Sequence, residues 1–526
     1  MYFNATWLTG LLLFVGGYYL FLFIVSFMVR IKKSLPQSPY FYFLIVPAKN
    51  EEKVIENTVN NILKIYGDNF RLIVTDDGST DTTSKIVQHI SEENKKVILL
   101  HKPQKGLKRG KGAVLNYSLE QIKRAILGRF FVPFNLPKDF LEEFPYERIV
   151  IGVFDADARP SSNILTEVSK VLNGEKADAV QTAVRISNRN QSLLARMQDV
   201  EFLGFSRIVQ KARSFFGSVG LGGNGQFTLL TALDEISAAP WGDTLTEDLE
   251  LGLRLISKGK KITFTDSAIV AQEGLTSLKA IIRQRTRWLQ GHFMNWRYIP
   301  SILRAPVHAK TRIDTLIYIV FVSVVFLVGL SIAVSALSVF HIIYVSNSML
   351  SIFYSKNYIL YTVALLLYSL AFIPMFIYSV FKFYGENSFV KKTLYVFLFA
   401  AYTYIWLPAG IIGLYNLAMK HNEWTKTERV TGGTSHRQLK QSPEIKERRA
   451  CPRYLFHTLS YTNKRICFID NVSCSGVKVV MKKEDFELIP KDVLVVKMPY
   501  GSEKRAIIVW KKEKDLYVEA GLKFTA

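Results

Sequence analysis

The run Tyr42-Phe43-Leu44-Ile45-Val46 is apolar and unbroken, and a second run, Arg71-Leu72-Ile73-Val74, follows further along the chain. Between them, apolar residues recur at helical spacing, at Val54, Ile55, Val59, Ile62 and Leu63. A strand, a helix and a second strand in this order predict an α/β fold with a largely parallel sheet, continuing to about Val270. Ligands of such sheets bind beyond the carboxyl ends of the strands, so polar residues there are the first candidates for a site.

The composition indicates a membrane protein rather than a nucleic-acid-binding one. The chain has 526 residues, 49% of them hydrophobic, and a formal net charge of +23. Lysine and arginine cluster beside apolar segments and no nucleic-acid-binding motif is present, so the charge fits cytoplasmic membrane loops and predicts no nucleic-acid partner. The three cysteines lack zinc-site spacing and are expected to be reduced thiols: Cys451, Cys467 and Cys474.

Four long apolar stretches interrupt the chain. The first, Trp7–Val29, is long enough to span a bilayer and is followed by three basic residues, so residues 1–33 are predicted to be a retained transmembrane anchor. The basic flank places the following region in the cytoplasm. The other three stretches fall within residues 310–420, which we expect to be transmembrane or interfacial: Ile313–Val345, Tyr358–Phe381 and Thr393–Ala418.

Two acidic pairs follow predicted strands. Asp76 and Asp77 end the second strand, where carboxylates can accept hydrogen bonds from a uracil ring and ribose hydroxyls, although an ordinary Asp-Gly turn is the alternative. Asp155 and Asp157 lie just past an apolar run, and both side chains point to the same side if the strand geometry persists. Their hard oxygen ligands suit Mg²⁺ or Mn²⁺ bridging substrate phosphates, whereas a solvated strand end is the alternative.

Two further motifs supply a cation and an acid. In the stretch Arg109–Asn116, glycines permit close backbone approach and Lys111 can reach a nucleotide. Thr246-Glu247-Asp248 precedes a helical pattern, so Thr246 can also be the cap of that helix and the acids can favour its dipole. Among these residues we predict Asp248 to be the general base that takes the proton of an acceptor hydroxyl.

The segment Ile281–Tyr298 is basic, aromatic and amphipathic, so residues 276–300 are predicted to form an interfacial helix. Gln284, Arg287 and Trp288 share one face of this helix by their i, i+3, i+4 spacing. Arg287 can pair with a diphosphate, and Trp288 offers an apolar plane for an acceptor sugar. A helix that only lies on a membrane surface is the alternative.

From Val46 to Trp288, the order and spacing of these motifs resemble those of processive family 2 glycosyltransferases, such as cellulose, chitin and hyaluronan synthases. The resemblance implies a GT-A fold over residues 38–275, inversion to a β-linkage, and synthesis on the cytoplasmic side from a UDP-sugar onto a growing glycan acceptor. The segment Leu221–Phe227 lies where the family has its acceptor-side segment, but its sequence differs from that of typical cellulose synthases. The implied roles are nucleotide-sugar binding at Asp76, Asp77, Lys111, Asp155, Gln284 and Arg287, acceptor binding at Trp288, metal binding at Asp155 and Asp157, and catalysis at Thr246, Glu247 and Asp248.

The tail has short β-branched runs separated by turns, which predict a small all-β domain over residues 448–526. The stretches Arg449–Arg453 and Asn471–Gly476 resemble the two motifs of a PilZ domain, and Glu519–Phe524 resembles its closing strand. The resemblance implies a PilZ-like β-barrel that binds cyclic di-GMP as an allosteric activator, with arginines that grip phosphates and stack on guanines. The implied ligand contacts are Arg448, Arg449, Arg453, Asn471, Ser473 and Gly476.

The membrane topology has a parity problem. Two cytoplasmic domains must be separated by an even number of spans, yet three apolar stretches lie between them, and Lys382, Lys391 and Lys392 mark the loop after the second as cytoplasmic. We therefore predict that Thr393–Ala418, which contains Pro408, is interfacial or re-entrant. Residues 421–447 are expected to be a segment similar to the gating loop of related synthases, followed by a linker. This organisation predicts a multi-pass protein of the inner (cytoplasmic) cell membrane that needs a homo-oligomer or a partner for export.

The sequence therefore predicts a β-glycan synthase activated by cyclic di-GMP, with UDP-glucose as donor and cellulose, mixed-linkage glucan or a related β-glucan as product. One alternative is a UDP-GlcNAc polymerase that makes a chitin-like or poly-N-acetylglucosamine chain. A second is a cyclic di-GMP receptor with an inactive transferase body. A third is a single-transfer lipid glycosyltransferase, although such enzymes generally lack the Gln-x-x-Arg-Trp element.

Overall fold

The computed structural model describes residues 5–104, 110–127, 134–137, 139–320, 375–384, 388–419, 454–462, 465–473, 476–482, 494–497, 503–513 and 517–524. The chain divides into two compact units. Most of residues 1–433 form the first unit, and residues 434–526 with two short upstream segments form the second.

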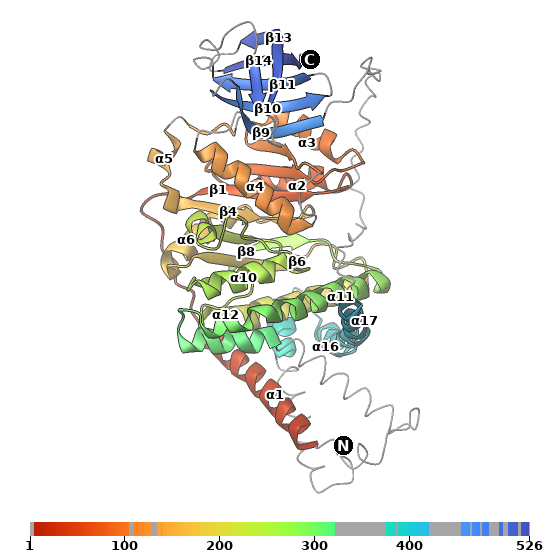
Figure 1. Ribbon diagram of the computed structural model, residues 1–526. Helices are drawn as coiled ribbons and strands as arrows, with labels where there is room; N and C mark the ends of the chain where they lie inside the picture. The colour runs from red at the N-terminus through yellow and green to blue at the C-terminus, as the bar shows by residue number, and fades with distance from the viewer. Residues whose placement is uncertain are drawn as a thin grey trace. The chain divides into compact units, whose positions relative to one another are not determined.

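An eight-stranded sheet is the centre of the first unit (Figure 1), with the strands in the spatial order β3-β2-β1-β4-β7-β6-β8-β5. β1 pairs in parallel with β2 and β4, and β6 with β8, whereas β7 is antiparallel to β4 and β6 and β5 is antiparallel to β8. The predicted α/β fold is thus confirmed, but the sheet is mixed around β7 and β5. The strands are β1 (Phe41–Ala48), β2 (Phe70–Asp76), β3 (Val97–His101), β4 (Ile149–Val153), β5 (Arg159–Pro160), β6 (Ala179–Ile186), β7 (Gln226–Leu229) and β8 (Ile262–Gln272).

The apolar runs of the sequence form the interior of this sheet. Phe43, Leu44 and Ile45 on β1 have no exposed surface, as expected for a central strand that is covered on both faces. Helices follow the strands and lie against the sheet, and the apolar positions of α2 are buried in the same core. The helices that surround the sheet are α2 (Ile55–Ile62), α3 (Thr83–Glu93), α4 (Lys111–Ile126), α5 (Phe140–Glu143), η1 (Tyr146–Arg148), α6 (Ile164–Glu175), α9 (Leu230–Asp234) and α10 (Glu247–Ser257).

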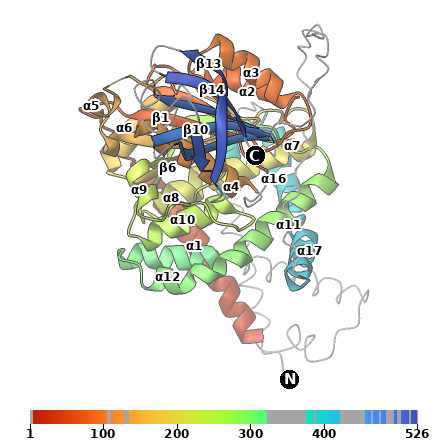
Figure 2. The ribbon, with the colours of Figure 1, turned by 45° about the horizontal axis from the view of Figure 1, so that its top comes forward.

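A second group of helices lies at the end of this unit from which α1 projects (Figure 1). α1 packs against η2 and α8, α7 packs against α16, and α11 packs along α17, as Figure 2 also shows. These elements are α1 (Ala5–Met28), α7 (Leu193–Gly204), the π-helix η2 (Phe205–Gln210), α8 (Lys211–Ser214), α11 (Leu278–Met294), η3 (Asn295–Tyr298), α12 (Ile299–Leu303), α16 (Phe389–Thr403) and α17 (Trp406–Ala418).

Polar contacts fix the predicted anchor to the sheet unit. Tyr18 of α1 donates a hydrogen bond to Asp314 at 2.8 Å, and Asp314 in turn forms a buried ion pair with Arg213 at 2.8 Å. The segment after α1 runs along α6, where Lys33 pairs with Glu167 at 2.8 Å. Residues 1–33 therefore contain the expected helix, and their placement in a membrane stays a prediction.

Apolar side chains are exposed on the helices of this group. Phe27 on α1 and Phe397 on α16 are 52% and 71% exposed, and Tyr415 on α17 is 60% exposed. These side chains are available for contact with lipid, and their placement in a membrane stays a prediction. The helical structure expected over residues 276–300 is present as α11, η3 and α12, and its place at a membrane interface stays a prediction.

Among the described residues, one helical stretch, Phe389–Ala418, is long and apolar enough to cross a membrane, and Leu12–Met28 is a shorter apolar helix. The predicted stretches Ile313–Val345 and Tyr358–Phe381 fall largely outside the described residues. Phe389–Ala418 is interrupted at Tyr404, whose carbonyl accepts from Leu407 N at 3.0 Å, because Pro408 has no N–H to donate to it. This break agrees with the interruption expected at Pro408.

The second unit contains a closed six-stranded barrel in the order β10-β11-β14-β13-β12-β9. The register of β10 against both neighbours shifts between Ile469 and Asn471, and Ser473 pairs with Gly476 at the start of β11. The expected all-β tail is confirmed as a barrel. Its strands are β9 (Tyr454–Thr462), β10 (Arg465–Ser473), β11 (Gly476–Lys482), β12 (Leu494–Lys497), β13 (Glu503–Glu513) and β14 (Tyr517–Phe524).

Candidate active site

The first predicted acidic pair lies at the carboxyl end of β2. The carboxylate of Asp76 accepts hydrogen bonds from the backbone N–H of Ser79 at 3.1 Å and from the Ser79 hydroxyl. Gly78 lies between them with a φ of 73°, so the Asp-Gly turn is present. Asp77 carries an ion pair with Lys49 Nζ at 3.7 Å. The turn holds both acids at the sheet edge where ligands bind, and their contact with a nucleotide stays a prediction.

The predicted metal motif lies in a turn beyond β4. The strand ends at Val153, and the N–H of Ala158 donates to the carbonyl of Asp155 at 3.0 Å. The strand geometry therefore does not persist through the motif, and alternation does not set the direction of its side chains. Asp155 contacts Lys111, whereas Asp157 accepts the backbone N–H of Glu273 at 3.0 Å.

Lys111 is the centre of the site. It begins α4 directly after Gly110, which has a φ of 100°, and its ammonium group lies 2.6 Å from Asp155 Oδ1 and 3.6 Å from Glu247 Oε1. It also donates to the carbonyl of Gly223 at 3.0 Å. Burial disfavours the charged form of Lys111, but Asp155 and Glu247 outweigh that effect and raise its pKa above the ordinary value. Lys111 is therefore a permanently charged group that can meet a diphosphate.

The loop before β7 brings its backbone close to Lys111 and Asp248. A Cβ atom on Gly223 would lie 2.6 Å from Lys111 Nζ and 3.3 Å from Asp248 Oδ2, so glycine leaves room for both groups, and a larger residue would displace the end of the Lys111 side chain. Asn224 accepts the backbone N–H of Asp155 at 3.3 Å, and Gln181 accepts the N–H of Gly222 at 2.8 Å. Sequence reasoning marked the segment Leu221–Phe227 but did not single out Asn224 within it.

The predicted catalytic triplet starts α10. Thr246 occupies the N-cap position without a capping hydrogen bond from its side chain; its hydroxyl accepts from Asn295 of η3 at 3.0 Å instead. Burial raises the pKa of Asp248, an effect that Lys111 and Arg287 partly oppose. Burial also raises the pKa of Glu247. A carboxylate whose pKa is displaced toward neutrality is suited to accept a proton from a hydroxyl.

α11 brings the last predicted group of residues to the site. Arg287 lowers the pKa values of Glu247 and Asp248, which shows that its charge acts on the catalytic acids. Gln284 accepts a hydrogen bond from Arg285 at 3.0 Å. Trp288 lies under the guanidinium of Arg285, at 4.0 Å from the ring centroid. Arg285, the second residue of the motif, was not among the predicted site residues.

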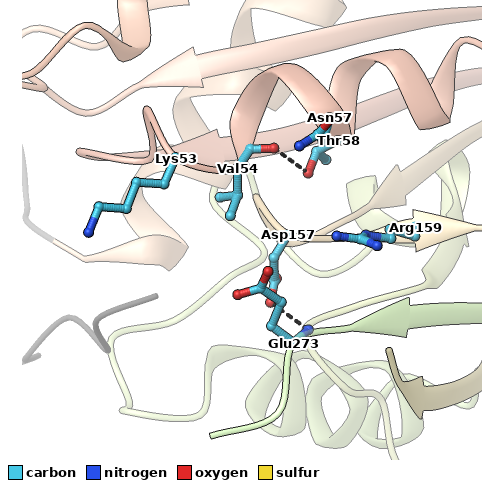
Figure 3. A pocket seen from close by; sticks show the side chains of 7 residues that line it. All are labelled: Lys53, Val54, Asn57, Thr58, Asp157, Arg159 and Glu273. Carbon is cyan, nitrogen blue, oxygen red and sulfur yellow. Dashed lines mark hydrogen bonds between the residues drawn. The ribbon is translucent and has the colours of Figure 1, made fainter. Parts of the chain in front are cut away.

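A small pocket lies on the Asp157 side of the motif. Figure 3 shows the carboxylates of Asp157 and Glu273 beside one another, with Lys53 from the turn that precedes α2, Asn57 from α2 and Arg159 from β5. Glu273 directly follows β8, and it was not predicted. An acid placed just past an apolar strand is the same signal that identified Asp155, so the sequence did contain it.

The acids of the site are compatible with a divalent metal. Asp155 is partly exposed, with 31% of its side chain accessible, and offers hard oxygen atoms beside a centre built for phosphate. In the part of the chain that the structure describes, no group of three or more histidine, cysteine or acidic side chains could hold a metal alone. A Mg²⁺ or Mn²⁺ ion at Asp155 and Asp157 would thus take its remaining ligands from substrate phosphates and water.

Comparisons with known proteins identify the family of the part of the chain that contains the sheet. Residues 38–291 match the family described as glycosyltransferase like family 2. A beta-monoglucosyldiacylglycerol synthase of Nostoc sp. is 30% identical over 294 residues, covering 55% of this chain and 56% of that protein. A poly-beta-1,6-N-acetyl-D-glucosamine synthase of Staphylococcus aureus is 25% identical over 243 residues, covering 46% and 52%. A mannosyltransferase of Pyrobaculum calidifontis, solved with GDP-Man and Mn²⁺, is 15% identical with a TM-score of 0.48, covering 73% and 99%.

The fold and the matches define a glycosyltransferase. Residues 38–291 are a family 2 glycosyltransferase domain with an α/β fold of the GT-A type. The chain spans about half the length of the first curated relatives that it matches, at 52% to 56% of theirs.

We expect Gly291→Ala to lower the rate of sugar transfer on the order of 10²-fold, because the added Cβ would lie 2.5 Å from Thr246 Oγ1 and push α11 away from the catalytic triplet. The measurement is UDP release by the purified protein. Gly252→Ala in α10 is the matched control, since its Cβ would meet no atom closer than 3.6 Å. An unaltered rate in Gly291→Ala would show that the contact between α11 and Thr246 does not position the catalytic acids.

The pH dependence of transfer should report the raised pKa of Asp248. The base accepts a proton only when unprotonated, so the rate falls as the pH drops through this raised value, above the range near 4 of ordinary aspartates. Arg287→Gln removes a charge that lowers the pKa, so the acid limb should move to higher pH. The exposed Arg283→Gln on the same helix should leave the limb in place. A limb that stays at the ordinary position would exclude Asp248 as the base.

Proposed function

We propose that this protein is a membrane-bound, inverting and processive glycosyltransferase that builds a β-glycan from a UDP-sugar, with UDP-glucose as the main candidate donor. One observation carries the proposal. The ammonium group of Lys111 bonds Asp155 at 2.6 Å and faces Glu247 at 3.6 Å, next to Asp248, so a cation, the metal motif and a base with a raised pKa meet at one point.

In the proposed reaction, Asp248 accepts the proton of an acceptor hydroxyl while that oxygen attacks the anomeric carbon of the donor. The new C–O bond forms as the bond between the anomeric carbon and the diphosphate oxygen breaks, and UDP leaves with the bonding electron pair. Attack from the side opposite to the leaving group inverts the anomeric centre and gives a β-linkage from an α-linked donor. Lys111 and Arg287 stabilise the negative charge that develops on UDP.

The remaining predicted residues take supporting roles in this proposal. Asp76 and Asp77 bind the nucleoside at the end of β2, and Gln284 joins Arg287 at the diphosphate. When bound at Asp155 and Asp157, Mg²⁺ or Mn²⁺ would neutralise phosphate charge. Trp288 provides the plane against which the acceptor sugar lies. Thr246 and Glu247 hold the start of α10 in place for Asp248.

The identity of the acceptor has two candidates. A growing glycan is the acceptor that the Gln-x-x-Arg-Trp motif favours, and the relative from Staphylococcus aureus is named for a β-1,6-linked N-acetylglucosamine polymer, which keeps UDP-GlcNAc as the alternative donor. A diacylglycerol is the second candidate, because the relatives that are 29% to 30% identical are named beta-monoglucosyldiacylglycerol synthases. The intact Asp157, Asp248 and Arg287 argue against the interpretation as a receptor with an inactive transferase body.

The barrel supports a regulatory role for the tail. We propose that it is a PilZ-like domain that binds cyclic di-GMP and activates transfer. Asn471, Ser473 and Gly476 lie where β10 passes its register shift and meets β11, a backbone irregularity of the kind found beside binding sites. Arg448, Arg449 and Arg453 lie outside the described residues, as does the gating-like segment 421–447. The protein would be multi-pass in the cell membrane, with both domains in the cytoplasm and an oligomer or partner for export.

The decisive experiment measures UDP release by the full-length protein in detergent with Mg²⁺ or Mn²⁺. UDP-glucose and UDP-GlcNAc are compared, each with and without cyclic di-GMP and with and without added diacylglycerol. We expect cyclic di-GMP-dependent turnover of UDP-glucose into a product that linkage-specific β-glucanases digest. A product that partitions into organic solvent only when diacylglycerol is added would replace the polymer interpretation with a glycolipid one.

Asp248→Asn supplies the control for chemistry in the same assay. It should abolish transfer while UDP binding stays near that of the unaltered protein, because the amide keeps the shape of the side chain but cannot accept the proton. A comparable loss of UDP affinity would show that Asp248 binds nucleotide instead.

We expect Arg453→Ala to remove activation by cyclic di-GMP and to leave basal transfer unchanged, since the arginine would bind the guanine base and phosphate of the ligand. Arg437→Ala, in the linker that precedes the motif, is the matched control and should keep activation. Binding of labelled cyclic di-GMP and UDP release are measured together. Undiminished binding in Arg453→Ala would count against the tail as the receptor.

A further inference from the structure

Arg285 is a buried cation at the junction of four helices. Its side chain has no exposed surface and forms an ion pair with Glu201 of α7. It also donates hydrogen bonds to the hydroxyl of Tyr402 on α16 at 3.0 Å and to Gln284 at 3.0 Å. Tyr402 and Trp406 donate in turn to the two carboxylate oxygens of Glu201, at 2.9 Å and 3.3 Å. One charge pair thus joins α7 and α11 to α16 and α17.

The same guanidinium contacts two indole rings. Its central carbon lies 4.0 Å from the ring centroid of Trp288 and 5.3 Å from that of Trp406. The two ring centroids are 6.4 Å apart, and Phe202 of α7 meets Trp288 edge-on at 6.3 Å. Planar guanidinium groups bind aromatic faces and carboxylates simultaneously, which a lysine ammonium group does not reproduce. Arg285 therefore sets where the plane of Trp288 lies relative to α17.

The contacts of Arg285 specify an orientation of the neighbouring side chains and do more than hold the helices together. Apolar side chains of similar volume often pack as stably as a buried ion pair, so the pair is best explained by the geometry that it specifies. A Cβ on Gly413 of α17 would lie 3.4 Å from the carbonyl of Thr286, so the two helices are already in close contact beside the pair. On the other side, Arg287 acts on Glu247 and Asp248. α11 thus carries both the catalytic contact and the contact with the apolar helices.

We propose that Arg285 is a positioning residue that holds Trp288 in register with α17, so that the apolar helices α16 and α17 determine where the acceptor meets Asp248. This inference rests on the proposed function, which places the acceptor at Trp288. Its consequence is a separation of two properties: Arg285 governs acceptor transfer and leaves UDP binding to Lys111, Asp155 and Arg287.

The test compares Arg285→Lys with Arg283→Lys, an exposed position on the same helix. In Arg285→Lys we expect transfer to the acceptor to fall on the order of 10²-fold, as for a small displacement of a reacting group, while UDP affinity and the slow transfer to water are unchanged. Arg283→Lys should match the unaltered protein in all three. A purely structural role would lower transfer, hydrolysis and UDP affinity together, and that result would overturn the proposal.

A second variant tests whether a loss of transfer in Arg285→Lys comes from a folding defect. Arg285→Met combined with Glu201→Gln removes both charges and leaves no unpaired ion, so the protein should fold, yet it lacks the group that binds both indoles. We expect it to transfer as poorly as Arg285→Lys. Transfer at the level of the unaltered protein in this double variant would also overturn the proposal.

Circular dichroism in the near ultraviolet gives a readout that does not depend on turnover. Trp406→Phe identifies the signal of the Trp288–Trp406 pair, and both Arg285 variants should lose that signal while Arg283→Lys keeps it. If the unaltered protein turned over no donor, the proposed function would fail, but the spectra would still decide the positioning role. A retained signal in Arg285→Lys would contradict it.

Discussion

The candidate site depends on keeping one buried lysine charged. Lys111 loses solvation where α4 begins, and the carboxylates of Asp155 and Glu247 compensate for that loss, with a smaller contribution from Asp248. Asp155 comes from the end of β4 and Glu247 from the start of α10. Keeping Lys111 charged therefore requires β4, α4 and α10 to hold fixed positions relative to one another. Gly223 follows from the same requirement, since any larger residue would occupy the space in which Lys111 and Asp248 face each other.

This arrangement places two aspartates of one site in different surroundings. Asp155 lies directly against the ammonium group at 2.6 Å and stays partly exposed, whereas burial raises the pKa of Asp248 and the charges of Lys111 and Arg287 only partly oppose it. Partly exposed oxygen atoms would suit Asp155 to a metal ion, and a raised pKa would suit Asp248 to proton transfer. The ammonium group of Lys111 would thus allow two residues of the same type, Asp155 and Asp248, to take different roles.

The sequence was informative where chemistry follows directly from a strand end. Asp76 and Asp155 come at the ends of apolar strand patterns, so their place at the carboxyl edge of the sheet was predictable, whereas Asp248 opens a helical pattern. The direction of Asp157 was not, because β4 ends at Val153 and a turn intervenes. The Thr246 side chain bonds η3 rather than its own helix, because α11 and η3 come close enough at Gly291 to offer Asn295 as a partner. Arg285 was missed because α11 is contacted from several sides, by the catalytic triplet and by α7, α16 and α17, so periodicity alone could not identify the buried charge.

These contacts give α11 a role that neither the sheet nor the apolar helices can supply separately. A rigid helix transmits displacement along its length, and on α11 Arg285 and Arg287 are only two residues apart, one bonded to α7 and α16 and the other acting on the catalytic acids. A glycan chain and a lipid both have to pass between the site and the membrane, so either acceptor would arrive along α11. On the proposed function, residues at the sheet edge would select the nucleotide sugar, and the packing of α11 against α17 would determine which acceptor is used.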